Sequence, residues 1–463
     1  MASERVEEDS IGKVHVPSNA YYGSFTLRAS QNFKISGIRA SPEFISAYSI
    51  IKRSAALANL RAGKLDKKIA GAIVKACDEI ISGKLSDQFI VDIFQAGAGT
   101  STNMNVNEVI ANRALEILGK KKGDYSLVHP NDHVNMSQST NDTYPACIRI
   151  SSYLAIHSKL IPALTRLHRS LDAKAKEFSG VVKLGRTHLQ DAVPITLGQE
   201  FSGYASSIAR QLLELERASQ GLLELPIGGT ATGSGINAPE KFAELAIAEI
   251  KKSTGKNFKK CENIFGTMQN RSEELEMSSA LRGTAVALSK IANDLRLLGS
   301  GPRAGFGELI LPEVQPGSSI MPGKINPSVP EMVNMVCFQV IGNDEAILQA
   351  ASAGQLEINV FMPLIASDLL FSINILASAV STLERLCIHG ITANVKTISK
   401  HLEENLSLAT ALTPYIGYEK AAQIANRAHK EGRSIKEICI EMRLLKKEEL
   451  DRILDHRRLA GIK

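Results

Sequence analysis

The segment Gly317–Pro327 holds the residues with the clearest potential for chemistry. Ser318 supplies a hydroxyl, Lys324 a cation and Asn326 an amide donor, with glycines and prolines among them. Because glycine and proline interrupt helices and strands, we predict a loop. Such a loop can hold a carboxylate between Lys324, Asn326 and backbone N–H groups, and Ser318 is the candidate for the chemical step. An ordinary surface loop is the alternative, and further segments of the same character argue against it.

Two of these further segments are Gly97–Glu108 and Gly185–Pro194. The first precedes a helical pattern, so part of it should cap that helix. One Ser, Thr or Asn is enough for capping, whereas six of the eight residues from Thr100 to Asn107 are of these types. The second carries His188 among Thr, Gln and Arg side chains. His188 is therefore a candidate proton carrier.

The segment His129–Asp142 is polar almost throughout and has little to anchor a core. A metal site is conceivable from His129, Asp132 and His133. Their spacing matches no common metal signature, so we expect a hydrogen-bonded polar loop and no metal.

The glycine-rich segment Gly228–Gly235 looks superficially like a dinucleotide-binding loop. No strand is expected before it, and long helical patterns flank it. We therefore predict a glycine-rich turn.

The elements that must position these segments are helical from about residue 40 onward. Two helices are predicted at 43–63 and 66–83, and five long ones at about 145–178, 198–225, 273–298, 329–353 and 360–387, with a kink at Pro162. Helices of roughly 25 to 35 residues are about 40–50 Å long, which favours an elongated bundle. Their stripes hold more Ala, Ser and Leu than one core needs. We therefore expect them to pack against copies of themselves.

Past Gly390 the pattern changes to short helices with glycine and proline breaks. We predict a mainly α subunit with three domains, at residues 1–138, 139–390 and 391–463. The polar segments lie at the ends of long rigid helices and far apart in sequence. A site built from several subunits of an oligomer would bring them together.

The composition of the chain limits the kinds of binding partner and the cellular location that we expect. The chain has 463 residues and a net charge of +6, with basic residues spread along it, so we do not expect nucleic acid as a partner. Six scattered cysteines indicate reduced thiols in a cytoplasmic protein. The acidic N-terminus is unlike a secretory signal, and charged residues interrupt the apolar stretches, so no membrane-spanning helix is expected.

Taken together, these segments resemble the fumarase/aspartase superfamily over essentially the whole chain. Gly317–Pro327 is similar to its signature loop, and Thr100–Glu108, Ser137–Asp142 and Gly185–Pro194 to its other active-site regions, in the same order. The resemblance implies a homotetramer in which five long helices from each subunit form a 20-helix core. It also implies active sites shared by three subunits and a small dicarboxylate substrate. We expect no cofactor.

The family's reaction is an anti elimination that gives fumarate through an aci-carboxylate intermediate. The resemblance makes Ser318 the base, on a mobile loop, and His188 a substrate contact oriented by Glu331. Backbone amides and Lys324 must stabilise the serine anion, because an unassisted serine is a poor base. The carboxylate that accumulates charge would be bound by Lys324, Asn326 and Thr187. The other carboxylate and the leaving group would be bound by Thr100, Ser139, Thr140 and Asn141.

The leaving group is ammonia or water, depending on the branch of the family. Several features resemble aspartases. They are the stretch Asn19–Ala29, the absence of tryptophan, and the residues Ala98 and Thr140, at positions where fumarases carry serine. The stretch Ile416–Ala422 resembles fumarases, as do His129, Asn131 and Asp132, which match a second dicarboxylate site of that branch. We favour elimination of ammonia from L-aspartate (a carbon–nitrogen lyase). Fumarate hydratase is the alternative, and a non-catalytic structural member of the family is a remote one.

Overall fold

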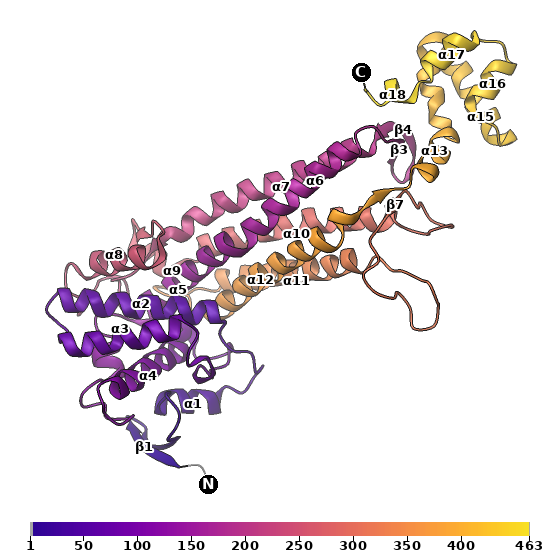
Figure 1. Cartoon of the computed structure of the whole chain (residues 1–463). Helices are drawn as coiled ribbons and strands as arrows, with labels where there is room; N and C mark the ends of the chain where they lie inside the picture. The colour runs from indigo at the N-terminus through magenta and orange to yellow at the C-terminus, as the bar shows by residue number, and fades with distance from the viewer. Residues whose placement is uncertain (1–2, 463) are drawn as a thin grey trace. The chain divides into compact units, whose positions relative to one another are not determined.

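The structure of the chain is a computed structural model that describes residues 3–462 (Figure 1). Most of these residues lie in helices, which confirms the mainly α fold class. The α-helices are α1 (Ser24–Asn32), α2 (Pro42–Arg61), α3 (Lys67–Ile81), α4 (Thr100–Ile117), α5 (Thr140–Ala155), α6 (Ile161–Glu177), α7 (Leu197–Ser219), α8 (Phe242–Thr254), α9 (Ile264–Gln269), α10 (Ser272–Leu298), α11 (Ser328–Ser352), α12 (Met362–Leu386), α13 (Val395–Glu403), α14 (Thr413–Ile416), α15 (Tyr418–Glu431), α16 (Ile435–Glu441), α17 (Lys447–Ile453) and α18 (His456–Leu459).

The strands are short and form two-stranded sheets. They are β1 (Glu4–Asp9), β2 (Gly12–Pro17), β3 (Val182–Thr187), β4 (Gln190–Thr196), β5 (Glu224–Leu225), β6 (Lys259–Lys260), β7 (Leu309–Ile310) and β8 (Thr392–Ala393). The pairs β1–β2, β3–β4 and β7–β8 are antiparallel, and β5–β6 is parallel.

The chain divides into two compact units. The first comprises residues up to Ile161, Leu213–Gly283 and Phe338–Leu376, and the second Pro162–Leu212, Thr284–Cys337 and the residues from Ala377 on. Helices α7, α10, α11 and α12 contribute residues to both units. The three domain boundaries derived from the sequence stay a prediction.

In the first unit, helix starts follow the capping signals of the sequence. Ser41 caps α2 by accepting from the Phe44 amide, and Asp66 caps α3 by accepting from the amides of Lys68 and Ile69. Helix α2 packs against α3, α5 and α8, and α2 and α3 lie side by side in Figure 1. An aromatic cluster of Phe44, Tyr48 and Tyr144 fills the contact between α2 and α5.

The long helical pattern predicted at 145–178 is two helices joined by a π-helical segment, Ile156–Leu160. The Ile161 N–H reaches back five residues to the Ile156 carbonyl, directly before Pro162. Proline has no N–H to continue the normal ladder, so the extra residue of a π segment accommodates it. The predicted kink at Pro162 stays a prediction, and the helix begins at Thr140, before Pro145, and not at Pro145.

Helix α12 bears on the prediction of no membrane-spanning helix. The stretch Met362–Gly390 is long and apolar enough for a membrane span, with a mean hydropathy of 1.7. No charged residue lies between Asp368 and Glu384, so the claim that charges interrupt every apolar stretch is wrong here. Within the structure, 56% of its most apolar window is already buried, as in the core helix of a helical bundle. This one helix is therefore weak evidence for a membrane protein.

The segment before Gly228 also corrects a prediction. Strand β5 precedes the glycine-rich segment and pairs in parallel with β6, and α8 lies between them in sequence. The expected absence of a strand is therefore wrong. Two residues are too few to leave an alternating pattern in the sequence. The segment Gly228–Gly235 itself is a series of turns, as predicted.

Candidate active site

The Ser318 segment is a loop, as predicted, and its ends are tied together. The Gly317 N–H donates to the Lys324 carbonyl at 2.8 Å, and Asn326 Nδ2 donates to the Gly317 carbonyl at 2.6 Å. A side chain at Gly317 would place its Cβ 2.5 Å from the Lys324 carbonyl oxygen, so only glycine fits. The loop between these ties is exposed to solvent over Ser319–Ile325.

Ser318 itself receives two backbone hydrogen bonds. Its Oγ accepts from the N–H groups of Ile320 at 3.2 Å and Met321 at 3.0 Å. Donors that face an oxygen stabilise its anionic form and lower its pKa. The loop therefore supplies the backbone support that a serine base requires.

Lys324 gives the loop its positive charge. Its side chain is exposed and lines a cavity of about 480 Å³ together with Ser318 and Met321. Among residues 3–462, no carboxylate lies within ion-pair distance of its ammonium group. Glu313 also lines this cavity, so an anion that enters it meets a carboxylate as well as the Lys324 ammonium group.

Thr187 and His188 lie at the tip of a β-hairpin and not in a loop, which corrects the prediction for Gly185–Pro194. Strands β3 and β4 pair up to Thr187 opposite Gln190. His188 and Leu189 form the two-residue turn, with φ of 55° and 60°. Positive φ at both central residues is typical of hairpin turns, but Asn and Gly are the usual occupants. Strained backbone of this kind concentrates at functional sites.

A buried carboxylate anchors the hairpin. Glu308 is fully buried, and it pairs with Lys183 at 3.0 Å and Arg186 at 2.7 Å, both on β3, and with His401 on α13 at 3.1 Å. Burial raises the pKa of Glu308, but the Arg186 hydrogen bond and the Lys183 charge outweigh it, so the pKa lies below its ordinary value. The hairpin also packs against α13 (Figure 1). This anchoring fixes the position of Thr187 and His188.

Replacing Glu308 by glutamine is expected to lower the free energy of unfolding by about 3–5 kcal/mol, because Arg186 loses its buried counter-ion and Lys183 keeps only Glu200, at 2.9 Å. The pKa of Glu308 is lower in the folded chain, so its contribution is present above the pKa of unfolded glutamate. It is lost as the pH falls through the folded-state pKa. Urea unfolding at neutral and acid pH measures both effects.

Glu384→Gln is the matched control for that variant. Glu384 is only partly buried and accepts a hydrogen bond from Ser170 at 2.7 Å. The control should cost less than about 1 kcal/mol. Equal losses in the two variants would argue against an anchoring role for Glu308.

Glu331 lies in the first turn of α11 and is half-buried. Within the part of the chain that the structure describes, no hydrogen bond or ion pair joins it to His188. The predicted pair of His188 and Glu331 stays a prediction.

Thr100 belongs to the first unit and is the first residue of α4. Gly99 caps this helix with φ of 85°, and a Cβ there would lie 2.0 Å from the ring of Tyr144. The polar residues after Thr100 are inside the helix and buried, so most of the predicted polar loop is a helix face. These buried polar residues are Ser101, Thr102, Asn103, Asn105, Asn107 and Glu108.

Ser139, Thr140 and Asn141 form the N-terminus of α5. Ser139 caps the helix in a reciprocal capping box with Asp142. Helix N-termini carry partial positive charge and free N–H groups, which suits a carboxylate. Asn141 Nδ2 donates to the Ala231 carbonyl at 2.7 Å. Sequence reasoning missed Ala231, because nothing local links the glycine-rich segment to α5.

Asp142 connects the same two segments. Its Oδ1 accepts from the Ser139 N–H at 2.9 Å, and its Oδ2 accepts from the N–H groups of Gly228 and Thr230, both at 3.1 Å. Burial raises its pKa to about 6, against the effect of these donors. With donors on both oxygens, Asp142 holds the turn as a carboxylate. The spacing of a capping box was the signal in the sequence that could have revealed it.

The segment after His129 contains a π-helical turn, Pro130–Val134, anchored by the buried Pro130 and Val134. The expectation that it lacks apolar anchors is therefore wrong. His129 Nδ1 accepts from the N–H groups of Asn131 at 3.1 Å and Asp132 at 3.2 Å. The same nitrogen lies 3.6 Å from a carboxylate oxygen of Asp132. The second dicarboxylate site at His129, Asn131 and Asp132 stays a prediction.

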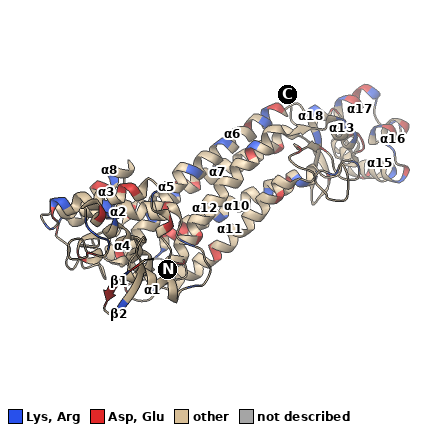
Figure 2. Cartoon of the chain, turned by 60° about the horizontal axis from the view of Figure 1, so that its bottom comes forward, with Lys and Arg blue, Asp and Glu red and all other residues tan. Residues whose placement is uncertain are grey.

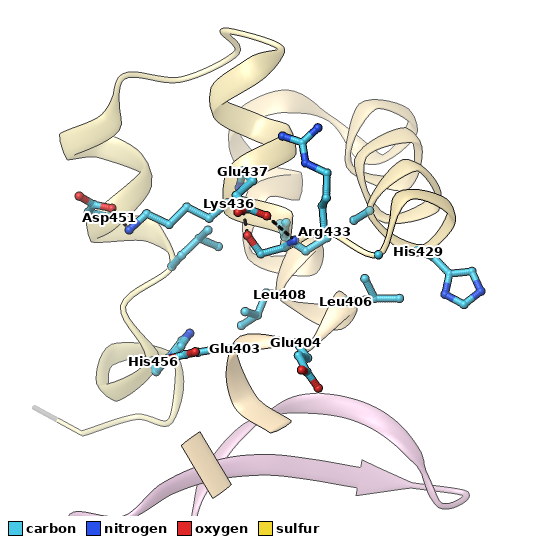
Figure 3. Close-up of a pocket in the computed structure, with 15 residues that line it drawn as sticks. Glu403, Glu404, Leu406, Leu408, His429, Arg433, Lys436, Glu437, Asp451 and His456 are labelled. Carbon is cyan, nitrogen blue, oxygen red and sulfur yellow. Dashed lines mark hydrogen bonds and ion pairs between the residues drawn. The ribbon is translucent and has the colours of Figure 1, made fainter. Parts of the chain in front are cut away.

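Within residues 3–462, no group of three His, Cys, Asp or Glu side chains could hold a metal ion. A separate cavity of about 760 Å³ lies among the C-terminal helices, lined by charged residues such as Glu403, Lys436 and Asp451 (Figure 3). None of the predicted site residues lines it.

The predicted site residues fall into two sets. The first unit holds Thr100, Ser139, Thr140 and Asn141. The second unit holds Thr187, His188, Ser318, Lys324, Asn326 and Glu331. Each set alone presents donors for a carboxylate, and the second also contains the candidate base.

Comparisons with known proteins identify the family of the chain. A lyase family profile matches residues 12–342, and a profile of the fumarase C C-terminus matches residues 408–461. An aspartate ammonia-lyase from a Bacillus species is 47% identical over 464 residues, covering 99% of each chain. The mitochondrial fumarate hydratase of Homo sapiens is 48% identical over 468 residues, covering 100% of this chain and 92% of the human one. A class II fumarase structure from Schistosoma mansoni has a TM-score of 0.96 and 38% identity, and the match covers 99% of each chain. The chain therefore belongs to the fumarase/aspartase superfamily of lyases.

Proposed function

We propose that the chain catalyses the reversible anti elimination of ammonia from L-aspartate to give fumarate. The observation that carries this choice is the orientation of Asn141. The Ala231 carbonyl can only accept a hydrogen bond, so Nδ2 of Asn141 must face it. Oδ1 of Asn141 then remains as an acceptor for the substrate, beside the second N–H of Nδ2.

A substrate ammonium group fits such an acceptor, because it has donors and no lone pair. It also leaves as ammonia without needing a proton from the enzyme. A leaving hydroxyl must instead be protonated, and an amide oxygen supplies no proton. Ala98, buried in the short turn before α4, offers no hydroxyl for that purpose either. Both features support ammonia over water as the leaving group.

The remaining roles follow the chemistry of the loop and the hairpin. Ser318 removes the proton from the carbon next to a carboxylate, and the two amides on its Oγ support its anion. Lys324, Asn326 and Thr187 bind the carboxylate that becomes the aci-carboxylate, where preorganised donors have most effect. Thr100, Ser139 and Thr140 bind the other carboxylate.

We also propose that the chain acts as a homotetramer. Helix α11 exposes a stripe of large apolar side chains at helical spacing: Met335 (64% exposed), Phe338 (62%), Ile341 (36%) and Leu348 (38%). Charged residues are sparse along α11 and α12 (Figure 2). A second copy that covers this stripe would extend the helical bundle, and a 20-helix core uses five helices from each of four chains. Copies packed in this way could also supply the predicted partners of His188 and Glu331.

A cytoplasmic location completes the proposal. The six cysteines are all free and buried, which suits a reducing compartment. One relative is named as mitochondrial, so the compartment has to be tested by fractionation of the source cells.

Fumarate hydratase is the second candidate. The match of residues 408–461 to a fumarase C profile and the 48% identity to the human enzyme favour it. Under this reading, L-malate replaces L-aspartate and the same base acts on it.

Fumarate absorbance in the ultraviolet distinguishes the candidates when the purified protein is given L-aspartate and L-malate separately. We expect fumarate from L-aspartate. Fumarate from L-malate alone would replace the ammonia-lyase proposal by a hydratase. Fumarate from neither substrate would contradict both and favour the structural alternative. Ser318→Ala protein, prepared in parallel, controls for a contaminating lyase.

A further inference from the structure

A lysine that the reaction scheme does not use lies inside the first unit. Lys52 on α2 is fully buried, and its Nζ donates to Asn135 Oδ1 at 2.8 Å. Burying an ammonium group is costly, and an apolar side chain of similar length would avoid that cost. The reason for burying this charge lies in the residue that it binds, Asn135.

Asn135 is the junction of three segments. Besides Lys52 of α2, its Oδ1 receives Asn103 Nδ2 at 3.3 Å and Asn107 Nδ2 at 3.2 Å, both from α4. Asn135 itself belongs to the segment that leads into α5, and its Nδ2 donates to the Gln138 carbonyl at 3.2 Å. A single side-chain amide therefore joins α2, α4 and the approach to α5.

Both helices at this junction lead to proposed substrate residues. Thr100, Asn103 and Asn107 lie three and four residues apart on α4, so they share one face of that helix. On the other side, Gln138 is followed directly by Ser139, and Asn141 lies two residues further on. The position of Asn135 thus sets the position of Thr100 relative to the N-terminus of α5.

The segment needs to be held, because its backbone is strained. Ser137 has φ of 63°, a conformation that non-glycine residues rarely adopt. A second residue of α2 helps to hold it: Asn59 donates to the Met136 carbonyl at 3.0 Å and accepts from Ser137 Oγ at 2.7 Å. Asn59 lies two turns after Lys52, so both project from the same face of α2.

Polar groups around Lys52 offset part of the cost of burying its charge. Oδ1 of Asn103 and Oδ1 of Asn107 are buried without hydrogen-bond partners, although both residues bind the same atom as the ammonium group. The groups that face Lys52 are Asp142 and Cys147 of α5, Cys77 of α3 and the Tyr48 ring, 5.4 Å from Nζ. Burial lowers the pKa of Lys52 to about 7, and the charge of Asp142 opposes that shift.

We propose that Lys52 is a positioning residue for the elimination: its buried ammonium group holds Asn135 and thereby sets Thr100 against the Ser139–Asn141 segment. This inference rests on the proposed function only in assigning those residues to the substrate. It applies equally to L-aspartate and L-malate.

Lys52→Met tests the proposal, because methionine fills the space without the charge. Kinetics are measured on the substrate that the wild-type protein uses, and melting temperatures on the same samples. We expect kcat/KM to fall about 10- to 100-fold, chiefly through KM, as for a misplaced binding group. The melting temperature should stay the same or rise, since a buried charge is removed. A kcat/KM within twofold of wild type, or a loss of activity that parallels a loss of folding, would overturn the proposal.

Ser54→Ala is the matched control. Ser54 lies on the same helix, is fully buried, and its hydroxyl has no hydrogen-bond partner among the described residues. It contacts none of the junction residues through a hydrogen bond, so its kinetics should match the wild type. A loss equal to that of Lys52→Met would show that any polar change in α2 disturbs activity, and would overturn a specific role for the ammonium group.

The pH dependence of KM gives a readout that a merely structural lysine would not move. As the pH rises through about 7, Lys52 loses its proton, its hold on Asn135 weakens, and KM should rise. This rise should be absent in Lys52→Met. In Asn135→Asp, a carboxylate beside Lys52 should raise its pKa and shift the midpoint to higher pH. An unshifted midpoint in Asn135→Asp would overturn the proposal even if Lys52→Met fails to fold.

Amide hydrogen exchange separates this proposal from the proposed function. In Lys52→Met, the amides of residues 135–141 should exchange at least several times faster than in wild type, with α3 unchanged. That comparison needs no activity. Unchanged exchange would overturn the positioning role, whereas a wild-type protein that forms no fumarate would overturn the proposed function alone.

Discussion

Replacing Ser318 by alanine is expected to reduce kcat by about 10²–10⁴-fold, the range for loss of a general base. The side chain lies on a largely exposed loop and accepts only the two amides of Ile320 and Met321. Its removal therefore takes away the proposed base without opening a cavity in a core. Steady-state formation of fumarate, with circular dichroism to verify folding, measures the effect.

Ser319→Ala is the neighbouring control. Ser319 is exposed, and no hydrogen bond to its hydroxyl is found among residues 3–462. We expect it to retain most of its activity. If Ser319→Ala loses turnover and Ser318→Ala keeps it, the base has been assigned to the wrong serine.

Lys324→Ala should impair both KM and kcat, and kcat by about 10²–10³-fold, as when a donor to a developing anion is removed. In the proposed mechanism Lys324 binds the same carboxylate before and during the reaction, so ground-state binding should weaken as well. The ammonium group has no carboxylate partner in the part of the chain that the structure describes, so its loss should leave the fold intact. Initial rates over a range of substrate concentrations separate the two effects.

Lys396→Ala is the control for charge. Lys396 is exposed on α13 in the same compact unit, and its replacement by alanine removes the same single positive charge. Near-normal kinetics in Lys396→Ala would assign the effect of Lys324→Ala to local binding. Equal losses would point instead to long-range attraction of the substrate by the net positive charge.

Local signals made much of the fold predictable. Asp66 and the Ser41–Pro42 pair start helices where capping chemistry says they should, and the long apolar patterns become α7, α10, α11 and α12. The hairpin at His188 was missed because His and Leu occupy turn positions that normally need Asn or Gly. The buried face of α4 was mistaken for a loop because its residues are polar. Their hydrogen-bond partners are distant in sequence, so the sequence does not show that they can be buried.

The sequence allowed a prediction of the residues that would carry out the chemistry, but not of the residues that hold them in place. Ser318, Lys324 and Asn326 could be chosen because their types fit carboxylate chemistry within one short segment. Ala231 and Lys52 could not, because each acts through a residue about 80 to 90 positions away in the chain. Nor could the sequence show that Glu308 holds the hairpin, since its three partners come from two distant segments.

The turn at Gly228 shows why a glycine-rich segment can imitate a nucleotide-binding loop. In both cases closely spaced backbone N–H groups surround an anion, and glycine lets the backbone approach it. Here the anion is Asp142, which the chain supplies itself. The glycine spacing indicates a turn that binds an anion, but it does not show whether the anion is a ligand or a side chain of the same protein. Such a motif in a helical protein is therefore worth checking against the chain's own buried carboxylates before a phosphate ligand is sought.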